Sequence, residues 1–172
     1  MIIWINGAFG AGKTTIATEL TNRIQPSFLY DPENIGDIFR SNLPTCMQKS
    51  DFQYYPEWRK WNTYLLKKIY QEYDGDIIVP MTLYKPEAVE GIIHCLKNDA
   101  IPLCHIQLDV SKETIITRLQ ERPPDLIKWG ESKVDEIIDA FKSVPQHEKI
   151  NNDGVPLEQV VNDIIKKINH QR

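Results

Sequence analysis

The sequence has few cysteines and no recognisable pattern among them. Cys46, Cys95 and Cys104 are widely spaced, so they supply neither a metal-ligand pattern nor a disulfide framework. We expect them to be free thiols in a reducing cytoplasm. The four histidines are scattered without ligand spacing, and we assign them no role.

Long apolar runs and an excess of positive charge are also missing. No apolar stretch approaches the roughly 18 residues that indicate a membrane-spanning helix, and the N-terminus lacks the basic segment of a signal peptide. The formal net charge is -4, whereas a nucleic-acid-binding surface is usually basic. We therefore expect a cytoplasmic protein whose main partner is not nucleic acid.

What remains is the composition of an ordinary globular protein. The chain has 172 residues, of which 41 % are hydrophobic and 26 % are charged, and this balance is typical of a packed domain. The length suits a single core, so we expect residues 1–172 to form one domain.

Residues 7–14 carry the clearest functional motif, Gly-Ala-Phe-Gly-Ala-Gly-Lys-Thr. This segment matches the phosphate-binding pattern G-x-x-x-x-G-K-[ST]. An apolar run at residues 2–5 precedes it as a buried strand would, and residues 14–20 have the apolar spacing of a helix. Strand, glycine loop and helix thus occur in the order that the motif requires, which favours a nucleotide site over a glycine-rich turn without a ligand.

The residue types in this loop explain how it would hold a nucleotide. Glycines let the backbone curl and present its N–H groups inward, and the following helix adds the positive end of its dipole. Lys13 would reach the terminal phosphates as a point charge, and Thr14 would place its hydroxyl on Mg²⁺. We therefore expect ATP and Mg²⁺, with the nucleotide held by Gly7, Ala8, Phe9, Gly10, Ala11, Gly12, Lys13, Thr14 and Thr15.

Apolar periodicity and turn residues predict that strands alternate with helices along the whole chain. This order predicts a three-layer α/β fold of the P-loop NTPase class, with a five-stranded, mostly parallel sheet. The expected strands are residues 2–5, 27–30, 76–79, 102–108 and 148–151; the expected helices are residues 13–24, 33–41, 57–73, 87–96, 111–122, 131–141 and 156–168.

Asp31 follows the second expected strand and precedes Pro32 and Glu33. This order is typical of a helix N-cap with proline at the first helical position. The carboxyl end of a parallel strand is also where open α/β sheets place their chemistry. The two interpretations are compatible, and we expect Asp31 to accept the proton of a substrate hydroxyl or to hold a Mg²⁺-bound water.

The end of the third expected strand departs from a common P-loop pattern. Many P-loop proteins place an aspartate beside Mg²⁺ there, whereas this sequence reads Val79-Pro80-Met81-Thr82. Either Asp31 supplies the carboxylate, or the metal is held mainly by Thr14, phosphates and water.

Two arginines precede the expected lid. Arg118 and Arg122 are four residues apart, so one continuous helix would place them on the same face. Pro123 and Pro124 would end that helix, and residues 123–130 would form a short lid loop. A solvated basic edge is the alternative, but we favour a hinged lid at about residues 118–131 whose arginines close on the transferred phosphoryl group.

Residues 152–154, Asn-Asp-Gly, are a strong turn signal after the last expected strand. Such a turn can contact the adenine ring, which makes Asn152 a further nucleotide-binding candidate. A plain turn explains the same residues.

Aromatic and basic side chains gather at about residues 33–73, where we expect the acceptor to bind. Trp58 and Trp61 follow an aromatic loop and lie beside Arg59. They either pack in the core, as their helical spacing allows, or wall a pocket for a flat ring. The expected acceptor-side residues are Asp31, Arg40, Phe52, Tyr55, Trp58, Arg59 and Met81.

Several separated blocks of the chain resemble the TmrB-type tunicamycin-resistance proteins, in the same order. The phosphate-loop block, residues 2–14, is generic, whereas residues 51–59 and Val79-Pro80-Met81-Thr82 are much more specific. The early loop, late arginines and short lid also resemble nucleoside-monophosphate, shikimate and gluconate kinases. The other matching blocks are Tyr30-Asp31-Pro32-Glu33, Ser111-Lys112-Glu113-Thr114 and Arg118-Leu119.

The resemblance implies an ATP-binding protein that protects against, or acts on, a nucleoside-containing compound. The missing acid after the third strand belongs to the same resemblance, so it does not argue against ATP binding. Family members can carry a C-terminal extension linked to membrane association. Because Arg172 follows soon after the last expected helix, we do not expect membrane association here.

Three functions therefore stay open. They are a small-molecule kinase for a nucleoside, nucleotide or uridine-bearing antibiotic, a drug-sequestering ATP-binding module, and a housekeeping nucleotide kinase. We favour the first, with Lys13, Asp31, Arg118 and Arg122 as its catalytic residues.

Overall fold

The computed structural model describes residues 1–121 and 124–172 and is built around a parallel sheet. Its strand order is β2-β3-β1-β4-β5, and every pairing is parallel. All carboxyl ends therefore lie at one edge, which confirms the predicted five-stranded α/β fold. The strands are β1 (Ile2–Asn6), β2 (Ser27–Leu29), β3 (Asp76–Pro80), β4 (Leu103–Asp109) and β5 (Lys149–Asn151).

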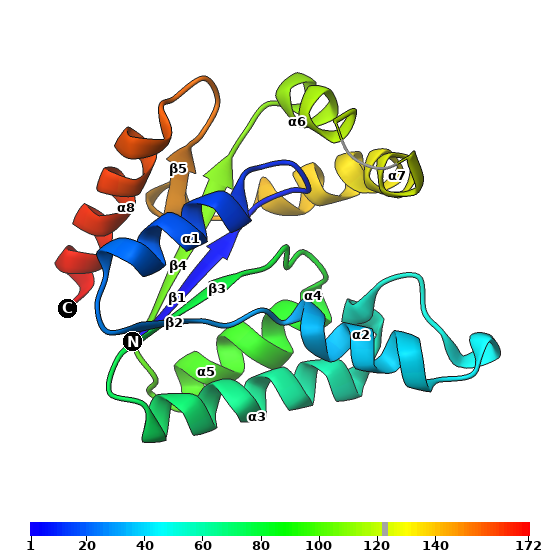
Figure 1. Cartoon of the computed structure of the whole chain (residues 1–172), viewed down its shortest axis with the longest axis horizontal. Helices are drawn as coiled ribbons and strands as arrows, with labels where there is room; N and C mark the ends of the chain where they lie inside the picture. Colours follow the sequence, from blue (N-terminus) through cyan, green and yellow to red (C-terminus); the bar gives the residue numbers. More distant parts are fainter. Residues whose placement is uncertain (122–123) are drawn as a thin grey trace.

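Helices cover both faces of this sheet (Figure 1). The helices α1 (Lys13–Arg23) and α8 (Leu157–Gln171) lie on one face, and α3 (Pro56–Glu72) and α5 (Cys95–Asn98) lie on the other. Side chains of β1 alternate between the two: Ile3 packs with α1 and α8, whereas Trp4 packs with α3. A strand buried on both faces is apolar at every position rather than at every second one.

A third apolar cluster lies at the carboxyl edge of the sheet. There α6 (Lys112–Leu119) and α7 (Pro124–Phe141) pack on the loop that follows β1. The cluster's buried members are Ala8, Tyr84, Ile115, Leu119, Val134 and Ile137.

On the β2 side, α2 (Glu33–Asn42) is followed by short helical turns before α3. The short elements are η1 (Thr45–Met47), η2 (Phe52–Tyr54), α4 (Pro86–Ala88), η3 (Val89–His94) and η4 (Gln146–Glu148). Within residues 1–121 and 124–172, no helix combines the length and the apolar character needed to cross a membrane.

Two expectations about helices near the lid are wrong. Residues 124–130 are not a loop, because α7 already begins at Pro124, and a proline is tolerated in the first turn of a helix. In addition, α6 ends at Leu119, so the continuous helix that would place Arg118 and Arg122 on one face does not exist. Arg122 itself lies outside the described residues.

The helix expected at residues 87–96 is also different in form. The chain is helical from Pro86 to Asn98, and its middle part, η3, is wound as a π-helix. Such wide turns occur mostly as single insertions within α-helices.

Candidate functional site

The glycine loop at residues 7–14 joins β1 to α1 at the carboxyl edge of the sheet. Gly10 and Gly12 have φ angles of 81° and 88°, which L side chains rarely adopt. At Gly12 a Cβ would also lie 3.1 Å from Nδ2 of Asn152. The helix α1 begins at Lys13, within this segment, and has no acidic residue in its first turn, so no carboxylate in that turn offsets its positive dipole end. The loop therefore has the properties of an anion seat.

Lys13 and two threonines stand at the start of α1. The Lys13 Nζ donates to the Ala8 carbonyl at 2.9 Å and lies 5.6 Å from the centre of the Phe9 ring. Thr14 and Thr15 are exposed, and a hydroxyl oxygen suits Mg²⁺. In the part of the chain that the structure describes, no three His, Cys, Asp or Glu side chains form a metal cluster. The residues present thus fit a Mg²⁺ ion only if phosphate and water complete its shell.

Arg118 and Asn152 both contact this loop. The Arg118 guanidinium donates to the Gly10 carbonyl at 3.3 Å and to the Asn152 carbonyl at 3.4 Å. The buried Asn152 side chain donates from Nδ2 to the Ala11 carbonyl at 2.6 Å. This position favours support of the loop backbone over the expected adenine contact for Asn152, and it leaves Arg118 at the rim of the anion seat.

Two carboxylates follow β2. The Asp31 Oδ1 accepts the Glu33 N–H at 2.9 Å, which is the contact of a helix cap. Although the Glu33 side chain is exposed, desolvation by the surrounding protein raises its pKa, and the Asp31 charge adds to this effect. Lys13 acts on the pKa of Glu33 in the opposite direction. The charge of Lys13 in the glycine loop therefore acts on Glu33. The position of Glu33 in a first helical turn did not indicate this.

Three of the expected acceptor-side residues are buried in the core rather than lining a surface. Tyr55 and Met81 are buried, and Trp58 is 0 % exposed. The Trp58 indole N–H donates to the Pro32 carbonyl at 3.0 Å. These contacts favour core packing for Trp58 over a pocket wall, whereas Trp61 is 45 % exposed.

The two expected acceptor-side arginines are engaged with their own neighbours. The Arg40 side chain pairs with Asp37 at 3.0 Å and lies 4.5 Å from the centre of the Phe52 ring. The Arg59 Nη1 donates to the Gln53 carbonyl at 2.6 Å. Both side chains therefore contribute to local structure, and an acceptor would have to compete for them.

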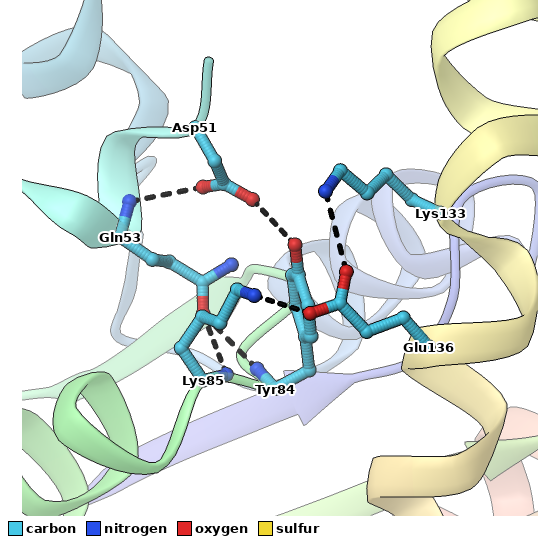
Figure 2. A network of polar contacts seen from close by, with 6 residues as sticks. All are labelled: Asp51, Gln53, Tyr84, Lys85, Lys133 and Glu136. Carbon is cyan, nitrogen blue, oxygen red and sulfur yellow. Dashed lines mark hydrogen bonds and ion pairs between the residues drawn. The ribbon is translucent and has the colours of Figure 1, made fainter. Parts of the chain in front are cut away.

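A polar network joins this acceptor side to α7 (Figure 2). The Gln53 Oε1 accepts the backbone N–H groups of Tyr84 and Lys85, each at 3.1 Å. The Tyr84 hydroxyl donates to Asp51 at 2.8 Å, and burial raises the pKa of Tyr84, with the Asp51 charge as the second cause. Lys85 pairs with Glu136 of α7. Sequence reasoning singled out the block at Asp51 by resemblance, and the structure shows that it anchors the chain after β3.

Comparisons with known proteins match this arrangement. The family model described as "AAA domain" matches residues 2–144. A putative adenylate kinase from Pyrococcus furiosus is 27 % identical, over 98 % of this chain and 84 % of that protein.

Solved structures extend the match to the whole fold. The Deinococcus radiodurans tunicamycin resistance protein is 25 % identical with a TM-score of 0.79, over 97 % of this chain and 94 % of that one. This confirms the predicted resemblance. A deoxyadenosine kinase from M. mycoides (18 % identity, TM-score 0.56, covering 99 % and 100 %) and a shikimate kinase from Aquifex aeolicus (21 %, 0.56, 99 % and 97 %) share the fold. Because the family model covers well over half of the chain, the protein belongs to the AAA domain family and has a nucleotide-binding, P-loop kinase-like fold.

Proposed function

We propose that this protein is a small-molecule kinase that transfers the γ-phosphoryl group of ATP to a hydroxyl of its acceptor. The observation that carries the proposal is the all-parallel sheet, in which β1 and β2 point in the same direction. It brings an anion seat and a pair of carboxylates, Asp31 and Glu33, to the same edge of the sheet. Ligands of open α/β sheets bind at this edge.

The loop side would hold and activate ATP. Backbone N–H groups of the loop and the start of α1 would bind the phosphates, and Lys13 would follow the charge on the transferred group. Arg118, which already contacts Gly10, would add a second cation there, and Arg122 is proposed from the sequence alone. Mg²⁺, held by Thr14 and phosphate oxygens, with Asp31 bound to one of its water ligands, would neutralise phosphate charge. Catalysis would then rest on positioning and electrostatics.

The carboxylate side would accept the proton of the acceptor hydroxyl. We assign this step to Asp31, whose Oδ1 accepts the Glu33 N–H and whose second oxygen would take the proton. Glu33 is the second candidate, because a raised pKa brings a carboxylate closer to the range in which a general base works best at neutral pH.

The acceptor that we propose is a nucleoside, a nucleotide or a nucleoside antibiotic of the tunicamycin type. The printed name of the Deinococcus radiodurans neighbour supports the antibiotic. We further propose that the chain acts as one cytoplasmic domain, with the acceptor region at about residues 33–73 and the lid at about residues 118–131.

Sequestration of a drug without phosphoryl transfer is the second candidate. The observation in its favour is the end of β3, which carries no acid at residues 79–82. A housekeeping nucleotide kinase, with turnover at ~1–100 s⁻¹, is supported by the name of the Pyrococcus furiosus relative.

Replacing Asp31 with asparagine separates transfer from sequestration. Asparagine keeps an oxygen that can cap the Glu33 N–H, so the fold should be retained. If Asp31 is the base, acceptor-dependent ADP formation falls by roughly 10²–10⁴-fold while ATP binding persists. Glu33→Gln is the matched variant, and a larger loss there would move the base to Glu33. Protection against tunicamycin that survives both changes would support sequestration and contradict the kinase.

A further inference from the structure

Gly7, the first residue of the loop, has both of its backbone polar groups bound by buried side chains. Its N–H donates to the Asn6 Oδ1 at 2.9 Å, and its carbonyl accepts the Thr82 hydroxyl at 2.8 Å. Asn6 is 2 % exposed and Thr82 is 1 % exposed, so water does not compete for these bonds. A Cβ at Gly7 would lie 3.0 Å from the Cβ of Ala11 and 3.2 Å from that of Leu108. The start of the loop is thus fixed by hydrogen bonds and by close packing.

The Asn6 amide also holds the chain after β3. Its Oδ1 accepts the Leu83 N–H at 2.8 Å, and its Nδ2 donates to the Leu83 carbonyl at 2.9 Å. Because the oxygen receives two backbone N–H groups, the orientation of the amide is determined by its partners. Gly7 and residues 82–83 therefore form one hydrogen-bonded unit across the neighbouring strands β1 and β3.

A histidine and a glutamate lie behind Asn6. The His105 Nδ1 is 2.6 Å from the Glu148 Oε2, and its Nε2 is 3.4 Å from the Asn6 Nδ2. The hydrogen bond with His105 lowers the pKa of Glu148, as expected for a carboxylate that accepts a proton donor. In the neutral tautomer that donates from Nδ1 to Glu148, the His105 Nε2 is an acceptor, and it faces the N–H₂ group of Asn6. His105 thus orients the amide that holds Gly7.

We propose that Asn6 and Thr82 are positioning residues that set the backbone of the phosphate loop for nucleotide binding, with His105 and Glu148 orienting Asn6. The inference rests on the proposed binding of ATP to residues 7–14. Loop N–H groups stabilise phosphate charge only when they are held in the right direction beforehand. At the end of β3, where many P-loop proteins carry a metal-side acid, this chain uses the Thr82 hydroxyl to hold the loop.

The Thr82→Val variant tests the proposal, because it removes the hydroxyl at almost constant volume. Thr63→Val is the matched control, since the buried Thr63 hydroxyl also donates to a backbone carbonyl, that of Gly91 at 2.9 Å, on the α3 side of the molecule. Both variants lose one such bond, so both should lose similar thermal stability. We expect only Thr82→Val to weaken ATP·Mg²⁺ binding measured by calorimetry, by about three- to tenfold, and Thr82→Ser to restore it.

A second variant keeps the test decisive if Thr82→Val folds poorly. Glu148→Ala removes the group behind His105 without touching the loop, and we expect it to weaken ATP binding by about twofold. If the wild type binds ATP and both Thr82→Val and Glu148→Ala bind it with the same affinity, the inference is overturned, but the proposed function is not. Equal losses of ATP affinity in Thr82→Val and Thr63→Val would also overturn the inference, because they would reflect the loss of stability that the two variants share. Failure of the wild type to bind ATP would instead overturn the proposed function.

Discussion

The phosphate loop and the acceptor side use their side chains in different ways. In the loop the proposed ligand-binding groups are backbone N–H groups and Lys13, and the neighbouring side chains Asn6 and Thr82 hydrogen-bond to the Gly7 backbone. On the acceptor side, Trp58 is buried and Gln53 is bound to the chain after β3. A seat made by the backbone can be recognised from a short motif. An acceptor pocket depends on which side chains remain uncommitted after packing, and a motif does not contain that information.

The largest effect is expected at Lys13, the loop side chain to which we assign the stabilisation of the transferred phosphoryl group. Lys13→Met keeps the length of the side chain and removes its charge, so acceptor-dependent ADP formation should fall by roughly 10²–10³-fold. Lys166→Met, at an exposed position of α8, is the control and should leave the rate unchanged. Similar rates of ADP formation for the two variants would show that Lys13 of the loop takes no part in the reaction.

A smaller effect, confined to the acceptor side, is expected for Gly36→Ala. A Cβ there would lie 2.4 Å from the Phe52 ring, so α2 or the ring must shift, at a cost of about 1–3 kcal/mol in the free energy of unfolding. Gly91→Ala is the control, because its nearest neighbour, in Arg59, would be 3.4 Å away. Urea denaturation measures the loss, and calorimetry should show unchanged ATP affinity. A matching loss of ATP affinity would show that the two regions are not independent.

Comparing variants of Trp58 and Trp61 should distinguish a role in core packing from a role in acceptor binding. Trp58→Phe leaves the buried Pro32 carbonyl without its indole donor, so we expect a loss of about 1–2 kcal/mol in the free energy of unfolding and little change in acceptor KM. Trp61→Phe, at an exposed position, should change stability by less than about 0.5 kcal/mol. If Trp61→Phe raises the acceptor KM, that residue lines the pocket; if Trp58→Phe does so without a stability loss, our assignment of Trp58 to the core is wrong.

The smallest effect concerns pH and the pair behind Asn6. The hydrogen bond from His105 lowers the folded-state pKa of Glu148, so its contribution to stability is present above the unfolded pKa, about 4.3. That contribution is lost as the pH falls through the folded pKa. Glu148→Gln should therefore flatten the loss of stability below about pH 4.3, whereas Glu158→Gln, at an exposed position of α8, should not. If the free energy of unfolding falls in the same way below about pH 4.3 in the wild type and in both variants, the pairing of His105 with Glu148 is contradicted.

Local rules explain why so much of the fold was predictable. Apolar runs predicted the five strands, and Gly12, a glycine that the motif requires, has a positive φ angle, as does Gly10 in the same loop. Spatial relations explain what was missed. Glu33 and Lys13 lie at the same edge of the sheet because the parallel strands β2 and β1 both end there, and His105 meets Glu148 although 43 positions separate them in the sequence. Helical spacing placed Trp58 and Trp61 on a common stripe but did not indicate how deeply each is buried. Pro124 did not mark a loop, because a helix tolerates proline in its first turn and α7 begins there.

Intact-mass analysis of tunicamycin and of simple nucleosides, incubated with the protein and ATP·Mg²⁺, tests the central claim most directly. The control incubations use the Lys13→Met protein. We predict that at least one acceptor gains the mass of a single phosphoryl group with the wild-type protein and not with the variant. An acceptor panel that stays unmodified while the protein binds both ATP and drug would contradict phosphoryl transfer.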